Sequence, residues 1–339
     1  DTKTLVSNSG LSYKGFDIGG LGFTFTPDEY RQFVAINPSE TAVIHPYING
    51  SDFYTSPRLA ASRYAINFVE MTLEEAGQFP ACLDRVRERV KPYRDTVKRE
   101  RNRERWWLYA ENRPGMRRAI SSLKSVLVKT QTSRTWAFAF LPSHYLFDQK
   151  LVVFPTASHA LFAVLQSEVH FVWAVRHASS LKSDMAYTPT DCFETFPFPF
   201  ALSRLSDTTL ETIGSAYYDC RTDIMRSCSE GLTSIYNRFH APEQATGDVK
   251  ELRELQIKMD CAVAAAYGWT DLDLGHDFHE TKQGIRFTIS EFARREILDR
   301  LLALNHERYA EELAQGLHDK GSKSKGCRKR SQDSQGELF

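Results

Sequence analysis

The spacing of hydrophobic and polar positions predicts helices in the first hundred residues. Thr26-Pro-Asp-Glu sets a capping Thr, a Pro and a Glu at the start of a helix over residues 26–36. Thr72-Leu-Glu-Glu repeats this arrangement, and an apolar stripe extends the second helix over residues 72–90, until a Lys-Pro step. A third, basic helix is expected over residues 94–109.

The period then changes to one typical of strands. Trp136, Phe138 and Phe140 alternate with alanine, and residues 151–154 form a continuous apolar run, so both segments are predicted strands. Residues 158–178 are apolar on most sides, which predicts a single helix packed within the core.

Helical periodicity dominates the last third of the chain. Alternating prolines in residues 195–200 can continue neither a helix nor a central strand, and we place a domain boundary there. Beyond it, helices are expected within residues 205–239, 249–267 and 289–317. A polar loop is expected over residues 271–286.

These elements predict an α+β fold. A mixed sheet-and-helix domain is expected over residues 1–200 and an all-helical C-terminal domain over residues 201–318. Residues 319–339 are rich in Lys, Arg, Ser and Gly and contain almost nothing to bury, so a disordered basic tail is predicted.

Charge is distributed unevenly, although the 339-residue chain has a formal net charge of zero. Residues 81–134 contain 16 Lys and Arg against 6 Asp and Glu, and the rest of the chain carries the opposite excess. The basic window is therefore a candidate electrostatic footprint for a polyanion.

Composition indicates a folded protein of the cytoplasm. Hydrophobic residues make up 42% and charged residues 25% of the sequence, and no apolar run reaches the length of a membrane span. The 6 cysteines have neither CxxC pairs nor regular spacing, so we expect no disulfide framework and no zinc site. The chain starts at Asp1 without the pattern of a signal peptide, and we expect it to be a fragment.

The usual catalytic and cofactor motifs are weak or missing. The glycines of residues 17–22 precede a predicted strand rather than a helix, which favours a strand entry over a dinucleotide loop. His276 and His279 lie in a polar segment, for which a solvated loop is favoured over a metal site. We find no nucleophile elbow, phosphate-binding P-loop or supported Cys/His pair. These observations favour a binding module over an enzyme that is active alone, and we expect no catalytic residue, cofactor or metal in this chain.

The segment KRERNRERWWLY at residues 98–109 is the strongest candidate for a binding site. A solvated helix face with local ion pairs is the simplest alternative. However, the acidic residues are too few to neutralise the basic ones, and arginine suits bidentate contacts with phosphates or guanine edges. We assign Trp106 and Trp107 to packing that anchors the segment.

Several short motifs resemble the target-recognition region of large adenine-specific DNA methyltransferases, namely the type IIG and MmeI-like restriction-modification enzymes and their relatives in BREX and DISARM phage defence. The matching motifs are NP at residues 37–38, INGSD at 48–52, RWW at 105–107, LVVF at 151–154 and YTPTDCFETFPFP at 187–199. LTSIYNRFH at 232–240, MDCAV at 259–263 and YGW at 267–269 resemble the helical C-terminal region of the same family. The resemblance extends over most of residues 10–315.

This resemblance implies a role in choosing a DNA site. In the family an upstream domain binds S-adenosylmethionine and methylates N6 of adenine through an Asn-Pro-Pro-Tyr type motif, which this sequence lacks. The expected partners are double-stranded DNA and a methylase domain or subunit, in cis or in trans. S-adenosylmethionine is expected in that methylase.

The candidate DNA-binding residues follow from their chemistry and position. Base-edge contacts are expected from polar residues beside the strands, with a weaker third group further along the chain. Phosphate contacts are predicted for Arg94, Lys98, Arg101, Arg103 and Arg105, base contacts for Gln131, Ser133, Arg134, His144 and Gln149, and the weaker group is Lys182, Ser183 and Tyr187.

Three further hypotheses stay open. The chain could be a freestanding specificity subunit that works with a separate methylase, or a non-catalytic scaffold of a phage-defence complex. In addition, Gln335, Leu338 and Phe339 loosely match a motif that resembles sliding-clamp ligands, for which a polar disordered end is the alternative.

Overall fold

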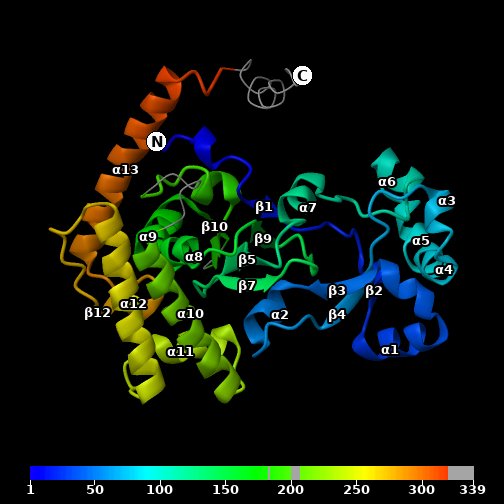
Figure 1. Cartoon of the computed structure of the whole chain (residues 1–339), viewed down its shortest axis with the longest axis horizontal. Helices are drawn as coiled ribbons and strands as arrows, with labels where there is room; N and C mark the ends of the chain where they lie inside the picture. The colour runs from blue at the N-terminus through cyan, green and yellow to red at the C-terminus, as the bar shows by residue number, and fades with distance from the viewer. Residues whose placement is uncertain (182–183, 200–206, 320–339) are drawn as a thin grey trace, which may run out of the picture.

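Two four-stranded sheets organise the N-terminal half of the molecule, as the computed structural model in Figure 1 shows; the structure describes residues 1–181, 184–199 and 207–319. The first sheet is antiparallel and consists, in spatial order, of β1 (Tyr13–Lys14), β9 (Leu151–Phe154), β5 (Ser125–Thr130) and β7 (Ala139–Pro142). The second consists of β2 (Thr24–Phe25), β4 (Arg63–Ile66), β3 (Ile44–Ile48) and β8 (Leu146–Phe147), with β3 and β8 parallel. Since β7 and β8 are close in sequence, the short turn between them passes from one sheet to the other.

Short helices and two small sheets accompany these two sheets. Seven of the described helices precede β5 in the chain: α1 (Pro27–Ile36), α2 (Gly50–Thr55), α3 (Leu73–Ala76), α4 (Pro80–Arg89), α5 (Lys91–Arg94), α6 (Glu100–Glu104) and α7 (Pro114–Ile120). Three 3-10 turns cover Val6–Asn8, Leu21–Phe23 and Pro38–Val43, and a π-helical turn covers Pro189–Phe193. The small sheets are β10 (Ser179–Leu181), β11 (Asp184–Ala186) and β6 (Thr132–Ser133), and the hairpin of β12 (Asp277–Thr281) and β13 (Gly284–Thr288).

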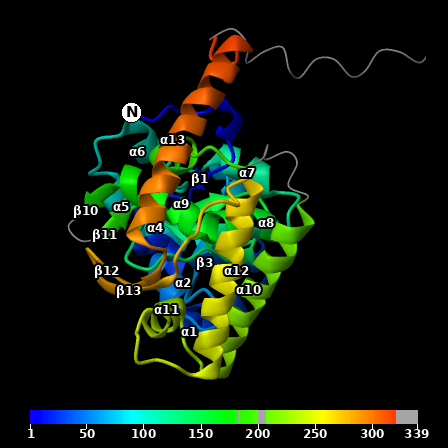
Figure 2. The same cartoon turned by 90° about the vertical axis from the view of Figure 1, so that its left-hand side faces the viewer.

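Long helices form the C-terminal part, so the predicted α+β class with a helical C-terminal region is confirmed. They are α10 (Thr208–Ser227), α11 (Leu232–Phe239), α12 (Gly247–Ala266) and α13 (Glu291–Ala314), and two further helices, α8 (His159–Gln166) and α9 (Glu168–His177), precede them. Figure 2 shows α10 and α12 side by side, and α10 also packs on α8. None of the described helices is long and apolar enough to cross a membrane.

Buried polar side chains join the helical part to the rest. Arg221 of α10 is buried, and its guanidinium donates to Phe138 O at 2.7 Å and to the Tyr236 hydroxyl at 3.0 Å. Asn305 of α13 holds the N-terminal segment, because its side chain accepts from Lys3 N at 2.9 Å and donates to Lys3 O at 2.8 Å. These hydrogen bonds fix α10 against α11 and the residue before β7, and α13 against the N-terminal segment.

Both predicted capping boxes are present. The Thr26 side chain accepts from Glu29 N while the Glu29 carboxylate accepts from Thr26 N, so α1 begins where the sequence indicates. Thr72 and Glu75 form the same pair at α3. However, that helix ends after one turn, and α4 starts afresh with Pro80 at its first position.

The predicted basic helix over residues 94–109 is wrong. The structure has only the single turns α5 and α6, and residues 106–110 are all buried. After α6 the backbone forms turns and bends instead of a helix, and this irregular segment lies in the core. The Arg103 guanidinium supports it, since Nη1 donates to Val97 O at 2.8 Å and to Lys98 O at 3.0 Å.

Three other expectations need correction. The single helix over residues 158–178 is broken at Ser167, whose backbone is extended and whose hydroxyl donates to Val164 O at 2.7 Å. The strand expected from Trp136 starts only at Ala139. The polar loop over residues 271–286 contains the β12–β13 hairpin, because Phe278 and Phe287 pair across its strands.

Two sequence predictions lie outside what the structure describes. The domain boundary near residue 200 falls at residues 200–206, and the predicted disordered tail falls almost entirely on residues 320–339. Both stay predictions. Trp106 and Trp107, by contrast, are buried as expected, and the Trp107 indole donates to Met71 O at 2.9 Å.

Candidate nucleic-acid interface

The basic segment over residues 98–105 presents three exposed cationic side chains. Lys98, Arg101 and Arg105 are exposed, and within the described residues no carboxylate lies within ion-pairing distance of them. Arg103 is half-buried because it bonds to backbone carbonyls of the same segment. The surface charge predicted for this segment is therefore present at three of its four predicted positions.

Arg94 is not a surface group, and its predicted phosphate contact is wrong. Its side chain is only 1% exposed, and Nη2 donates to Ile18 O at 3.1 Å and to Leu108 O at 3.3 Å. Burial lowers the pKa of its guanidinium. Gly19 packs directly on it: a Cβ at this position would lie 2.6 Å from Arg94 Nη2. Gly19 thus makes room for a buried arginine.

Helix α7 contributes basic residues that our sequence analysis did not name. Arg117 and Arg118 lie on this helix, and Arg113 precedes it with a left-handed backbone, at φ 45°. Arg99 Nη1 lies 3.1 Å from Glu111 Oε1, and Arg113 Nη1 lies 4.0 Å from Glu111 Oε2. Glu111 therefore links the basic segment to α7. The sequence signal that could have identified them is the Arg117-Arg118 pair, which follows a Pro-Gly helix start within the basic window.

A groove of about 720 Å³ runs along one side of α7. Its walls carry Arg117, Arg118, His45, His144 and Tyr145. The pKa of His45 lies below its usual value because burial, and then the nearby His144, disfavour the charged ring. Glu70 also lines the groove and pairs loosely with Arg117 at 4.0 Å, so cationic groups outnumber acidic ones. The groove offers both charge and an aromatic ring to a nucleic acid.

The other predicted base readers gather at the opposite end of the first sheet. Strand β5 places Ser125 opposite Pro142 and Thr130 opposite Leu151, so the turn that carries His144 and the turn that carries Gln149 lie at different ends. At the Thr130 end, Gln131 Nε2 donates to Gln149 O at 2.7 Å.

Serine and arginine complete this end of the sheet. Ser133 is half-buried and its hydroxyl donates to Thr135 O at 3.0 Å, whereas Arg134, Gln149 and Lys150 are exposed. We call Gln131, Ser133, Arg134, Gln149 and Lys150 the turn cluster. The structure therefore groups four of the five predicted base readers and separates His144 from them.

The weaker third group is not supported as a set. Lys182 and Ser183 lie outside the described residues. Tyr187 is 0% exposed and its hydroxyl lies 3.0 Å from His170 Nε2, so its predicted contact with DNA is wrong. Its ring instead packs beside the buried Lys129.

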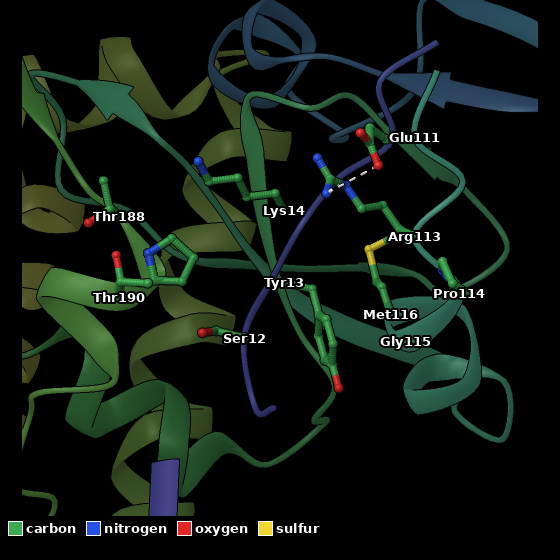
Figure 3. Close-up of a pocket in the computed structure, with 11 residues that line it drawn as sticks. Ser12, Tyr13, Lys14, Glu111, Arg113, Pro114, Gly115, Met116, Thr188 and Thr190 are labelled. Atoms are coloured by element: carbon green, nitrogen blue, oxygen red, sulfur yellow. Dashed lines mark ion pairs between the residues drawn. The ribbon is translucent and has the colours of Figure 1, made fainter. Parts of the chain in front are cut away.

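A second pocket, of about 460 Å³, lies on the other side of α7 (Figure 3). Strand β1, residues 111–116 and residues 188–190 line it. Figure 3 shows Lys14 extending between the Thr188–Thr190 turn and Arg113. Pro114 lines both this pocket and the groove, so α7 separates two polar depressions.

The two histidines considered for a metal site make ordinary hydrogen bonds. His276 Nε2 lies 2.8 Å from Asp260 Oδ2, and His279 Nε2 lies 2.8 Å from Gly275 O. Among the described residues, no group of three His, Cys, Asp or Glu side chains is placed to hold a metal ion.

Comparison with known protein families identifies the family of the chain. A sequence family described as "MmeI, target recognition domain" matches residues 13–200, which is more than half of the chain. The chain belongs to this family. Residues 13–200 are therefore a target-recognition domain, and the family resemblance inferred from the motifs is confirmed.

A solved structure extends the similarity of the fold beyond the target-recognition domain. It is titled "Structure of Type IIL restriction-modification enzyme MmeI in complex with DNA has implications for engineering of new specificities", and it matches with a TM-score of 0.63 at 17% identity. The match covers 91% of this chain but 37% of that protein, so the chain spans little more than a third of the enzyme it resembles. The search of curated protein sequences gives no significant match. Neither comparison supports a sliding-clamp contact by Gln335, Leu338 and Phe339, which lie outside the described residues.

Proposed function

We propose that the chain is the DNA sequence recognition portion of a site-specific adenine-N6 methyltransferase that acts in a restriction-modification or phage-defence system. The observation that carries this proposal is the target-recognition family over residues 13–200. Methyl transfer from S-adenosylmethionine belongs, in this proposal, to a methylase domain or subunit outside the chain.

Affinity comes from the basic surface. Lys98, Arg101 and Arg105 supply cationic groups without acidic partners among the residues described, and Arg117 and Arg118 add charge along the groove. Neutralising backbone phosphates releases counterions, so binding through this surface weakens as salt rises. Because phosphate contacts carry no sequence information, these residues fix position on the duplex rather than specificity.

Specificity is assigned to the turn cluster and to His144. Gln149 and Arg134 are exposed, and glutamine and arginine are the residue types that form paired hydrogen bonds with the major-groove edges of adenine and guanine, respectively. Gln131 bonds to Gln149 O and holds the turn in a defined shape. A rigid turn places the reading side chains at little entropic cost on binding.

Methylation of a base inside a duplex requires that the base leave the stack. A methylase therefore needs a separate grip on the duplex while that base is extruded. A recognition module with a charged surface and a rigid set of reading side chains fits this requirement, whether it acts in cis or in trans.

The binding surface is tested by charge reversal. Fluorescence anisotropy would compare the wild-type chain with the double variant Arg101→Glu/Arg105→Glu on a mixed-sequence duplex at two salt concentrations. Removing one phosphate interaction lowers the salt slope by about 0.9, so the double variant should show a slope smaller by roughly two units and should lose most of its affinity.

A matched control reverses two exposed lysines of α12, Lys250→Glu/Lys258→Glu, which lie on the helical part far from α6 in Figure 1. This control should keep its affinity to within about twofold, since distant surface charges are screened. Equal losses of affinity in both variants would mean that binding follows net charge alone, which would contradict the assigned surface.

A further inference from the structure

The pocket on the β1 side of α7 contains a buried hydroxyl without a partner. Ser12 is 7% exposed, and its Oγ is buried and makes no hydrogen bond with any residue that the structure describes. An unmade hydrogen bond of a buried hydroxyl costs free energy, so such a group usually awaits a ligand or an ordered water. Ser12 lines the pocket, and its hydroxyl is therefore available to a group that enters there.

Strand geometry puts a cation on the same side. Ser12 and Lys14 are two residues apart at β1, and alternate residues of an extended chain point to one face. Both side chains extend toward the Thr188–Thr190 turn in Figure 3. Lys14 is exposed, and among the described residues no carboxylate lies within ion-pairing distance of its ammonium.

The remaining polar groups are largely occupied. Thr188 Oγ1 and Thr190 Oγ1 donate to the Asp191 carboxylate at 2.7 Å and 3.2 Å, so both hydroxyl hydrogens are used. Glu111 faces Arg113 and is paired with Arg99 outside the pocket.

Arg113 adds charge that is only partly used. Its Nε donates to Gly15 O at 3.0 Å, while its Nη1 lies 4.0 Å from Glu111, which leaves guanidinium donors available. The residue is held with a positive φ, a conformation that is costly for arginine and that is often found at binding sites. Lys14 and Arg113 against the single lining carboxylate of Glu111 make the pocket cationic.

We infer that this pocket binds a phosphate group, with Lys14 and Arg113 supplying positive charge and the Ser12 hydroxyl donating a hydrogen bond. A phosphate oxygen is the acceptor that this combination of donors suits best. The phosphate comes either from the backbone of the DNA or from a free nucleotide. The DNA source rests on the proposed function.

Two variants and a control test the inference on the full chain. Lys14→Gln removes the charge and keeps most of the side-chain length, and Ser12→Ala removes only the hydroxyl. Lys250→Gln is the matched control on α12. Each protein is titrated with a mixed-sequence duplex by anisotropy at two salt concentrations, and with inorganic phosphate and ATP by calorimetry.

The two sources give different results. If the pocket takes a backbone phosphate, Lys14→Gln and Ser12→Ala each weaken duplex binding roughly tenfold, as expected for one hydrogen bond to a charged group, and Lys14→Gln lowers the salt slope by about one. If it takes a free nucleotide, the wild-type chain binds phosphate or ATP, both variants lose that binding, and their duplex affinity equals that of the control.

No change in either titration would overturn the inference. A wild-type chain that fails to bind duplex would count against the proposed function, while the calorimetric titration would still decide the pocket. Thermal unfolding gives an additional readout: Ser12→Ala should leave stability unchanged or raise it, because the hydroxyl has no partner to lose. A clear loss of stability would mean that Ser12 is merely a structural group.

Discussion

A lysine is enclosed in the core beside the turn cluster. Lys129 of β5 is 0% exposed, and its ammonium has no hydrogen-bond partner in the described part of the chain. Its Nζ lies 4.3 Å from the ring centroid of Trp136, 5.3 Å from that of Phe138 and 5.7 Å from that of Tyr187. Cation–π contacts offset only part of the cost of burying a charge without a counter-ion.

The magnitude of that cost follows from proton linkage. Burial lowers the pKa of Lys129 from 10.5 to about 7, and the nearby Cys192 opposes the shift only weakly. Above pH 10.5 the amine is neutral in both the folded and the unfolded chain. Between the two values the unfolded chain holds a proton that the folded chain lacks, so stability rises with pH by about 1.4 kcal/mol per unit. Below pH 7 both states are charged and the full cost, about 5 kcal/mol, applies.

We therefore expect Lys129→Met to stabilise the protein, and more so at low pH. Methionine keeps most of the length of the side chain and packs well against aromatic rings. Relative to wild type, the variant should be more stable by about 5 kcal/mol at pH 6 and by about 2 kcal/mol at pH 9. The free energy of unfolding is measured by urea denaturation of both proteins at both pH values.

The difference between the two pH values isolates the lysine, because packing changes in the variant contribute equally at both. Lys150→Met, which replaces an exposed lysine close by, is the control and should change stability little at either pH. A stabilisation that is the same at pH 6 and pH 9, or a loss of stability at pH 6, would refute the reasoning.

Three further predictions concern groups that hold the fold. Arg94→Ala should lower the free energy of unfolding, measured by urea denaturation, by about 3 kcal/mol, because two buried carbonyls lose their donor. The folded variant should keep the wild-type salt slope for duplex binding, and a lower slope would mean that Arg94 does contact a phosphate. Gly19→Ala should cost about 2 kcal/mol, since φ is +67° and the new Cβ would meet Arg94, and an unchanged melting temperature would be inconsistent with this packing. Asn305→Ala should cost about 2 kcal/mol and speed hydrogen exchange at Lys3, whose amide it holds; unaltered exchange there would argue against the contact.

Local signals in the sequence were sufficient for much of the fold. The capping boxes at Thr26 and Thr72 depend on residues three apart, so both could be identified from the sequence alone. The apolar run at β9 was equally clear, because all four of its residues are buried. The irregular segment after α6 could not be predicted in this way, because the burial of residues 106–110 is imposed by the packing of distant strands.

The candidate site was predictable in composition but not in geometry. The excess of arginine identified the basic window, yet composition cannot distinguish the buried Arg94 from the exposed Arg101. Similarly, Tyr187 and Gln131 are joined by a backbone hydrogen bond of 2.7 Å, but only the fold reveals that one side chain points inward. The separation of His144 from Gln149 follows from the register of β5, which short-range patterns do not specify.

The central claim, that this chain reads a DNA sequence, is tested most directly by selection from a randomised duplex pool. The full chain is incubated with the pool at two salt concentrations, and the retained DNA is sequenced. We predict that a defined motif is enriched at both concentrations, and that changing Gln149 and Arg134 alters the motif while Arg101→Glu/Arg105→Glu weakens retention of every sequence alike. Retention without any enriched motif would contradict the claim, because the chain would then bind DNA by charge alone.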